Sequence, residues 1–536
     1  MWHMNIRNIL KKWSSLFIII IILGIFFRIT NIGSKVYWVD EVATSIRVSG
    51  YTKQEVTQNI SNLDVISIKD LQKYQKLNER KDLNDTLKAL IKSPEHSPLY
   101  FLLTRFWVQL FGSSVVTTRS LSVVFSLLAL PCFYWLCREL FKLPLVSWIA
   151  VALFAVSPFY VAYAQEARPY SLWIVTILSS NIALLRAIRF NNRRSWLFYT
   201  ITLIIRFYTS LFSIFVATGQ SIYVIVLENF YFTKILKKWL LALSLAIIGF
   251  VPWLLVIFDN WQKFQDNTSW MRVPISLPVK IAIWIYSSAI VFVESPIYKA
   301  FDAIIVTRII VDLSLIFLII CAFYFLWRKA PRAVKLFILT STIIPTSLFI
   351  LIDVVFDLTT STAPRYTVPC QLGILLTLAY FLANKLAVNY KSNTKQIIWR
   401  IVLTTLISVE ILSCVFILNT SPKYQKTRNI SNIPIAAILN QAKSPILITE
   451  TKEILDIISL SYILEPRIKI QLLSKANLSQ LVDSCKNVFL FNPSASWQNK
   501  VNRKFKLEQV YQPKLLTSDE IALTLWMIEG LKNNCS

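Results

Sequence analysis

Long apolar runs alternate with short polar stretches from the N-terminus to about residue 418. Several runs hold roughly 20 apolar residues, enough to cross a hydrocarbon core of about 30 Å as a helix. The pattern predicts a polytopic α-helical membrane protein with about 11 transmembrane helices. These are expected at residues 14–32, 117–137, 146–163, 170–187, 196–208, 211–228, 239–258, 303–327, 335–356, 366–385 and 398–418.

Three apolar segments need separate treatment. The first run, Leu16–Thr30, follows basic residues and shows no small-residue cleavage site, so we expect an uncleaved spanning helix. The stretch 281–293 has only about 13 residues, which favours an interfacial helix over a span. Pro98–Phe111 is also too short to span comfortably and is expected to lie on the outer surface.

The composition changes after Ile417, where the tail resembles ordinary globular sequence. Short β-rich runs such as "PILIT" and "NVFLF" alternate with helical segments, a pattern typical of a small α/β domain. We therefore expect two domains, a transmembrane domain over 1–418 and an α/β domain over 419–536. The longest polar stretch before the tail, about 33–116, is the first extracytoplasmic loop.

Charge is sparse but strongly basic. Apolar residues make up 55% of the chain and charged residues 16%, against about 25% charge in soluble proteins. The net charge of +27 comes from basic clusters in every second short loop, which is the positive-inside pattern. This placement predicts a multi-pass plasma-membrane protein with a cytoplasmic N-terminus and an extracytoplasmic C-terminal domain. No basic face collects these residues, which argues against nucleic-acid binding.

The cysteines and glycines exclude several kinds of site. The chain has no CxxC pair and no His-rich tract, so a zinc site is not expected. Eight glycines and no P-loop give no support for nucleotide binding by a Gly-rich loop. Cys485 and Cys535 lie in the polar tail, and whether they form a disulfide is left open.

Four polar clusters fall where the outer membrane surface is expected. Ionisable residues at this depth cost roughly 2.5–3.5 kcal/mol each on insertion scales, which makes them functional candidates. All four lie on one side of the predicted topology. They are Asp40-Glu41, Glu95-His96, the segment "YAQEARPY" from Tyr163 to Tyr170, and the segment "STAPRYTVP" that contains Arg365 and Tyr366.

Such a set of side chains fits the transfer of a group from a lipid phosphate. A carboxylate must take a proton from the acceptor hydroxyl, a role that we assign to Asp40. Cations must stabilise the phosphate leaving group, and the planar fork of arginine suits Arg168 and Arg365 to this task. Trp261 and Trp270 flank an outer loop and are interpreted as interface aromatics.

Each cluster also has a simpler interpretation. The acidic pair fits a solvated turn beside the membrane, and His96 fits a cap for the helix near Pro98. Glu166 and Arg168 are close enough in sequence to pair only with each other. Arg365 fits a snorkelling residue at a helix end. Arg28 and Arg206 are interpreted as structural or lipid-facing, and Asp312, Asp353 and Glu410 are buried acids without an assigned role.

At these residues the chain resembles a known family. The segments "YWVDEVATS", "EHSPLYFLLTRFWVQLFGSSVVTTRSLSVVFSLLALPCFYWLCRELF" and "LFAVSPFYVAYAQEARPYSLW" resemble membrane glycosyltransferases of the GT-C fold. The resemblance is to the protein O-mannosyltransferase and aminoarabinose-transferase-like superfamily. It covers about residues 15–230, loosens towards 385 and is absent from the tail. The chain keeps the second proline of the family's His-Pro-Pro motif, as His96-Ser97-Pro98.

The resemblance implies an inverting transfer of a sugar from a polyprenyl-phosphate donor to an acceptor hydroxyl on the extracytoplasmic side. It places the catalytic aspartate at Asp40, beside Glu41, and the second acid at Glu166. The donor-binding residues would be His96, Tyr163, Arg168, Tyr170, Arg365 and Tyr366. Members of the fold differ in their use of a divalent cation, so a Mg or Mn site at Asp40, Glu166 and His96 is left open.

Two other functions remain as alternatives, a transporter or flippase of lipid-linked glycans and a non-catalytic receptor or assembly protein. Transporters often show matching halves with polar groups near the midplane, whereas the polar clusters here lie at one face. The sequence names neither the donor sugar nor the class of acceptor, which is a lipid, a glycan or a protein. Membrane lipids are the other expected partners.

Overall fold

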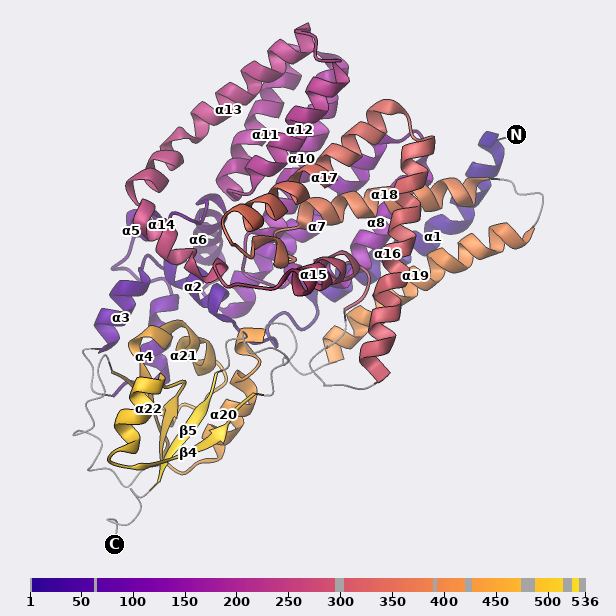
Figure 1. The fold of residues 1–536 in the computed structure, drawn as a ribbon. Coiled ribbons are helices and arrows are strands. Elements are labelled where there is room, and N and C mark those ends of the chain that lie inside the picture. Colours follow the sequence, from indigo (N-terminus) through magenta and orange to yellow (C-terminus); the bar gives the residue numbers. More distant parts are fainter. Residues whose placement is uncertain are drawn as a thin grey trace. The chain divides into compact units, whose positions relative to one another are not determined.

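The structure is a computed structural model that describes residues 2–61, 65–294, 303–388, 393–419, 427–473, 487–513 and 523–529. Its chain divides into two compact units. Unit 1 comprises Met1–Thr30, Ser93–Tyr100 and Arg119–Asn419, and unit 2 comprises Asn31–Lys92, Phe101–Thr118 and Thr420–Ser536. Figure 1 shows the order of their helices and strands along the chain. The domain boundary expected near residue 418 stays a prediction.

Unit 1 is built from helices, and a helix lies at each of the 11 positions where the apolar pattern predicts one (Figure 1). Its elements are α1 (Trp2–Ile29), α7 (Val115–Leu140), α8 (Pro144–Val156), α9 (Pro158–Ala164), α10 (Tyr170–Phe190), α11 (Arg193–Thr209), α12 (Ser213–Leu227), α13 (Lys234–Asp259), α14 (Trp261–Asn267), η2 (Ser269–Met271), α15 (Leu277–Ala289), α16 (Ala303–Lys329), α17 (Arg332–Val355), η3 (Thr360–Thr362), α18 (Val368–Ala387) and α19 (Asn393–Asn419).

Seven helices of the described residues are long and apolar enough to cross a membrane, and the bent pair α8–α9 adds an eighth if it is one span. The chain is therefore a multi-pass membrane protein, but the predicted number of 11 spans is not confirmed. The described apolar part of α1 has 17 residues, α11 also has 17 and α12 has 15. All three are shorter than the roughly 20 residues that a spanning helix usually has. The helix α15, of 13 residues, overlaps the stretch 281–293, whose interfacial position stays a prediction.

The third predicted helix is broken at Ser157, where α8 and α9 meet at 58°. Ser157 precedes Pro158 and takes an extended conformation (φ −61°, ψ 122°), as residues before proline prefer. A break of this kind leaves the last carbonyls of α8 without helical partners. Arg28 of α1 binds these carbonyls in place of helical N–H groups. Its guanidinium donates to Phe154 O (3.0 Å) and to Ala155 O.

Arg28 is thus a structural cation of the α1–α8 contact. It is fully buried, and its Nε donates to Ser126 Oγ at 2.8 Å. Gly24, one turn earlier on α1, lies against the same part of α8. A Cβ atom at Gly24 would be 2.4 Å from Ala155 O, so glycine is required for this close approach.

Unit 2 combines the first loop with the described part of the tail. Its helices are α2 (Val39–Val48), α3 (Lys53–Ser61), α4 (Ile68–Gln72), η1 (Lys73–Gln75), α5 (Leu83–Ile91), α6 (Leu99–Phe111), η5 (Thr427–Asn429), α20 (Asn432–Gln441), η6 (Thr451–Glu453), α21 (Ile454–Ser461) and α22 (Ala495–Asn502). Its strands are β1 (Ile446–Glu450), β2 (Lys469–Leu473), β3 (Val488–Phe491), β4 (Lys506–Tyr511) and β5 (Leu525–Glu529).

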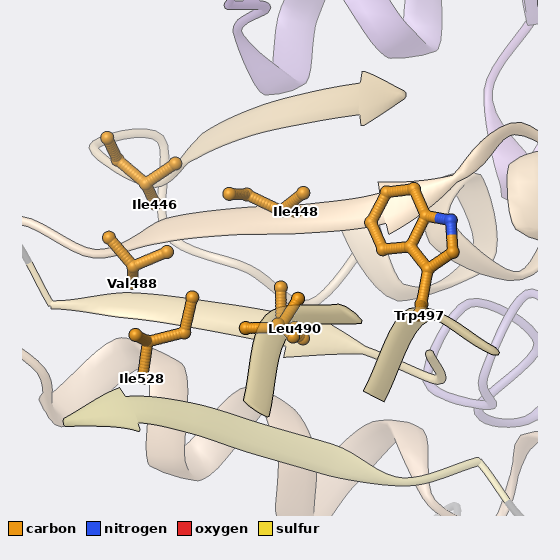
Figure 2. Close-up of a cluster of buried hydrophobic side chains, with 7 residues drawn as sticks. Ile446, Ile448, Val488, Leu490, Trp497 and Ile528 are labelled. Atoms are coloured by element: carbon orange, nitrogen blue, oxygen red, sulfur yellow. The ribbon is translucent and has the colours of Figure 1, made fainter. Parts of the chain in front are cut away.

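The strands form one sheet in the order β2-β1-β3-β5-β4. The first three are parallel, and β5 pairs antiparallel with both β3 and β4. Alternate side chains of a strand point to one face, and Figure 2 shows the apolar cluster that results. It comprises Ile446, Ile448, Val488, Leu490, Trp497, Val501 and Ile528. The small C-terminal α/β domain expected from the sequence is therefore present.

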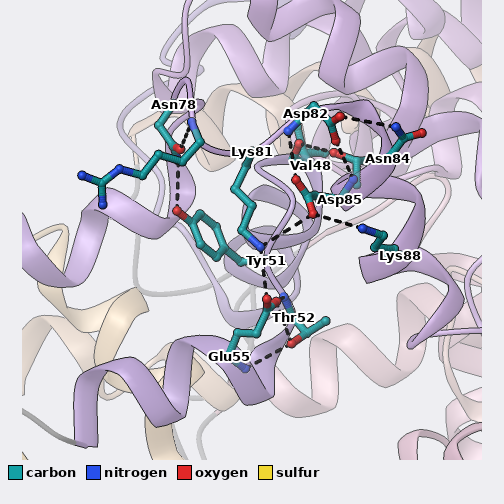
Figure 3. Close-up of polar contacts among 12 residues, drawn as sticks. Val48, Tyr51, Thr52, Glu55, Asn78, Lys81, Asp82, Asn84, Asp85 and Lys88 are labelled. Atoms are coloured by element: carbon teal, nitrogen blue, oxygen red, sulfur yellow. Dashed lines mark hydrogen bonds and ion pairs between the residues drawn. The ribbon is translucent and has the colours of Figure 1, made fainter.

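The first loop is folded rather than extended (Figure 3). Asp82 and Asp85 form a capping box at the start of α5. Lys81 Nζ lies 3.1 Å from Glu55 Oε1 and 3.9 Å from Asp85 Oδ1. The buried Arg105 of α6 donates to Val48 O at 2.9 Å, which connects α6 to the end of α2. Cys485 and Cys535 lie outside the described residues.

Candidate functional site

The acidic pair lies in unit 2, in the first turn of α2. Carboxylates are favoured there because the backbone N–H groups carry a partial positive charge. The two side chains differ in exposure: Glu41 is completely buried, whereas Asp40 is only partly buried. Asp40 is therefore the carboxylate of the pair that solvent reaches.

The Tyr163–Tyr170 segment lies in unit 1, between α9 and α10. Gln165 fixes it to the end of α1, because its side-chain amide donates to Phe27 O (2.9 Å), Arg28 O (3.1 Å) and Thr30 O (2.7 Å). These carbonyls end α1 and need partners from outside the helix. Gln165 is not among the predicted site residues, although it lies inside the Tyr163–Tyr170 motif.

Glu166 and Arg168 are each 5% exposed, and a tight turn joins them through the 2.7 Å bond from Arg168 N–H to Glu166 O. The rings of Tyr163 and Tyr170 meet edge to face with centroids 5.3 Å apart. The guanidinium carbon of Arg168 lies 5.9 Å from the Tyr170 ring. The structure thus brings four predicted site residues together in one buried segment.

His96 lies in the turn before α6, beside Glu95. The His96 Nε2 atom is 3.4 Å from Glu95 Oε1, and the Asn267 amide donates to Glu95 Oε2 at 2.9 Å. Ser97, which replaces a proline of the family motif, donates to Phe207 O at 3.0 Å. No sequence signal pointed to Asn267, because it follows Glu95 by more than 170 residues.

Arg365 and Tyr366 lie between η3 and α18. The Arg365 guanidinium carbon is 5.6 Å from the Trp270 ring and 5.1 Å from the Tyr366 ring, within the range of cation–π contacts. Tyr366 packs in turn on Phe212 with ring centroids 4.6 Å apart. Trp270, interpreted above as an interface aromatic, therefore also contacts Arg365, which is predicted to bind the donor.

Asp353 holds the segment that leads to Arg365. Its carboxylate is buried and accepts the N–H groups of Thr360 (2.8 Å) and Ser361 (2.7 Å), the first residues of η3. It also accepts the hydroxyl of Thr360. This gives a role to one of the three unassigned acids. A second, Asp312, accepts a 2.8 Å bond from Arg308 one turn earlier on α16.

Metal ligands are not gathered anywhere in the described part of the chain: no group of three or more His, Cys, Asp or Glu side chains is placed to hold one ion. The Mg or Mn site considered at Asp40, Glu166 and His96 stays a prediction.

Comparisons with known proteins add to this geometry. Residues 95–256 match the family described as dolichyl-phosphate-mannose-protein mannosyltransferase. No curated protein sequence matches the chain. The crystal structure of ArnT from Cupriavidus metallidurans bound to undecaprenyl phosphate is 13% identical with a TM-score of 0.50, covering 97% of this chain and 99% of that one. The chain has the GT-C fold.

Two further solved structures are similar at lower TM-scores. The apo state of the same ArnT is 11% identical (TM-score 0.48, covering 96% of this chain and 98% of that chain). The apo oligosaccharyltransferase of Archaeoglobus fulgidus is 12% identical (TM-score 0.49, covering 85% and 65%). The family match over residues 95–256 includes three of the predicted site residues, His96, Glu166 and Arg168. Asp40 and Arg365 lie outside the matched range.

Proposed function

We propose that the protein is an integral membrane glycosyltransferase. It transfers a sugar from a polyprenyl-phosphate donor to an acceptor hydroxyl at the extracytoplasmic surface, with inversion at the anomeric carbon. The observation that carries the proposal is the likeness over nearly the whole of both chains to a structure described as ArnT bound to undecaprenyl phosphate. The buried acid–arginine segment Glu166–Arg168 and the arginine at 365 supply the side chains that such a reaction needs.

Asp40 is the general base of the proposed reaction. Its carboxylate accepts the proton of the acceptor hydroxyl while the acceptor oxygen forms a bond to the anomeric carbon. The bond from that carbon to the phosphate oxygen breaks, and its electron pair leaves with the polyprenyl phosphate. Attack from the face opposite the leaving group inverts the anomeric centre. Glu41 is a supporting acid rather than the base, because its side chain is fully buried.

Arg168 and Arg365 are proposed to bind the donor phosphate, whose negative charge increases as the sugar leaves. Two parallel N–H donors of a guanidinium match the oxygens of a phosphate. Each guanidinium lies near a tyrosine ring, Tyr170 and Tyr366 respectively, which limits the conformations of its long side chain. Glu166, Tyr163 and His96 are proposed to complete the polar lining of the donor site.

The transporter alternative would draw support from the broken pair α8–α9, since discontinuous helices are common at transporter binding sites. In transporters, however, the freed backbone groups face the substrate. The carbonyls at this break accept hydrogen bonds from Arg28 instead. The break therefore has a structural explanation, and we retain the transferase proposal.

The test uses the full chain in lipid nanodiscs with a panel of polyprenyl-phosphate sugars and an acceptor fraction from the native membrane. Release of polyprenyl phosphate and gain of sugar by the acceptor are followed by mass spectrometry. Asp40→Asn is expected to abolish turnover, whereas the matched control Asp70→Asn, an exposed residue of the same loop, keeps it. Unchanged transfer by Asp40→Asn would refute the assignment of the base.

The proposed membrane orientation is tested separately. A cysteine placed at the exposed Glu508 of β4 is expected to react with a membrane-impermeant maleimide in intact cells, because the C-terminal domain is proposed to be extracytoplasmic. Labelling only after the membrane is opened would contradict this orientation.

A further inference from the structure

We propose that the C-terminal α/β domain positions the catalytic base: Asn429 and Ser459 hold the backbone that enters α2, and Arg428 is a positioning cation for Asp40. This inference rests on the proposed function, in which Asp40 takes the proton of the acceptor. All the residues concerned belong to unit 2. It assigns a role in the reaction to the part of the chain that has no family resemblance.

The start of α2 lacks a cap of its own. The N-cap residue is Trp38, whose side chain makes no capping hydrogen bond, although Ser, Thr, Asp or Asn is preferred at this position. The C-terminal domain provides a substitute. The N–H of Val39, the first residue of α2, donates to Asn429 Oδ1 at 3.2 Å, across 390 residues of sequence. Asn429 is 2% exposed, so water does not compete freely for this bond.

A second bond fixes the chain just before α2. The hydroxyl of Ser459 donates to Tyr37 O at 2.6 Å and itself accepts the Asn432 amide at 3.0 Å. The Tyr37 ring packs edge to face on Tyr462 with centroids 5.0 Å apart. These groups come from the start of α20 and the end of α21. The backbone on both sides of Trp38 is therefore bonded to the C-terminal domain, and Asp40 follows Val39 directly in the first turn of α2.

Arg428 adds charge to this arrangement. Its guanidinium makes two bonds to Asp456, from Nε to Oδ1 at 3.0 Å and from Nη2 to Oδ2 at 2.7 Å, and Asp456 is buried. Burial lowers the pKa of Arg428, but the hydrogen bond to Asp456 and the charges of Asp456, Glu453 and Asp40 outweigh this and raise it. Arg428 precedes Asn429 and Asp40 follows Val39, so the bond from Val39 N–H to Asn429 Oδ1 brings the two charged residues into the same region, where Asp456 holds the guanidinium.

The other charged groups around Arg428 come from three neighbouring elements. Arg47 lies on α2, Lys53 on α3 and Glu453 on η6, and with Asp456 they form the local charge set. Within this set, removing either member of the Arg428–Asp456 pair leaves the opposite charge behind. The two removals then change the charge near Asp40 in opposite directions, and a purely structural role of the pair would not produce opposite effects.

The first experiment measures hydrogen exchange of residues 37–48 in the full chain in nanodiscs, without substrate. Loss of an N-cap bond costs about 1 kcal/mol, or about fivefold in an equilibrium. Asn429→Ala and Ser459→Ala are therefore expected to speed exchange of this segment about fivefold. The matched control is Asn487→Ala, which removes a bond to Lys443 O in the same domain and should leave residues 37–48 unchanged. Unaltered exchange in both test variants overturns the backbone part of the proposal, whether or not the protein transfers sugar.

The second experiment measures how kcat/KM for sugar transfer depends on pH. The acidic limb of this profile reports the protonation of the catalytic base. Arg428→Gln is expected to move this limb to higher pH and Asp456→Asn to lower pH, each by on the order of half a pH unit. The double variant Arg428→Gln/Asp456→Asn should restore the wild-type position, and Arg428→Lys should keep it. Hydrogen exchange of β1–β3 verifies that each variant is folded.

The outcomes separate the two proposals. If Arg428→Gln and Asp456→Asn move the limb in the same direction, or not at all, the charge role of Arg428 is wrong while the transferase assignment stands. If the wild-type chain transfers no sugar, the proposed function fails, and the charge role fails with it. The exchange of residues 37–48 still decides whether the C-terminal domain holds α2.

Discussion

A buried carboxylate, that of Asp353, binds the segment that leads to Arg365, and replacing it tests whether Arg365 binds the donor. Asp353 accepts the N–H groups of Thr360 and Ser361 together with the Thr360 hydroxyl. The substitution Asp353→Asn keeps the shape of the side chain but retains only one acceptor oxygen. The amide NH2 then faces a backbone N–H, so two donors meet and one of the three bonds has no acceptor.

The size of the effect follows from these bonds. A hydrogen bond to a charged group contributes about 1.5–3 kcal/mol, and an unsatisfied buried donor costs about 1–3 kcal/mol. A net loss of about 2–3 kcal/mol shifts the segment towards open conformations by a factor of about 30 to 150. The apparent donor affinity falls with the fraction of molecules in the binding-competent state. We expect the donor KM to rise by about ten- to a hundredfold, with a smaller change in kcat.

The assay combines steady-state transfer at varied donor concentration with hydrogen exchange of residues 359–367. Asp357→Asn is the matched control, since Asp357 is exposed and its positive φ of 50° is one that Asn tolerates well. It should change neither readout by more than about twofold. Unchanged exchange in Asp353→Asn would refute the structural reasoning. Faster exchange with an unchanged donor KM would instead refute the role of Arg365.

Two further predictions concern stability. Gly24→Ala should destabilise the chain by about 1–3 kcal/mol because the new methyl overlaps the Ala155 carbonyl. Thermal unfolding measures this loss of stability. The control is Gly249→Ala, whose new methyl meets only the flexible Ile204 side chain. Burial and the nearby Asp456 raise the pKa of Glu453, so its ionisation opposes folding as pH rises above the unfolded value of about 4.3. Glu453→Gln should therefore be more stable than wild type at neutral pH, with the difference vanishing at acid pH; proteolysis of the C-terminal domain at both pH values decides it.

The positions of the helices followed from the sequence because a single quantity, apolar length, determines them. Where prediction and structure differ, a local feature intervenes. Pro158 divides the third predicted helix, and the break is stable because Arg28, on another helix, donates to the buried carbonyls that the break frees. An apolar pattern gives no indication of such a bond between helices. The same holds for the number of spans, since α11 and α12 have only 17 and 15 residues, fewer than the roughly 20 that a spanning helix needs.

The candidate site was predictable where its residues are neighbours in sequence. Tyr163, Glu166, Arg168 and Tyr170 lie between the end of α9 and the start of α10, so their proximity follows from local geometry. The residues that support them were not predictable. Asp353 was recognised as a buried acid, but its partners at Thr360 and Ser361 depend on how the chain folds back after α17. Asn267 reaches Glu95 from a distant loop.

Two of the predicted site segments begin with a short helix whose first N–H groups are bonded by a side chain from another element. Neither η3 nor α2 has a capping side chain at its own N-cap position. The N–H groups at their starts are instead bonded to Asp353 and Asn429, which lie on other elements. A helix start capped from elsewhere cannot form until that other element is in place. Coupling of this kind makes the position of Arg365 depend on α17, and the position of Asp40 depend on the C-terminal domain. The tail, which carries no recognisable motif, is therefore expected to control the base through backbone bonds and the charge of Arg428 rather than through contact with the substrate.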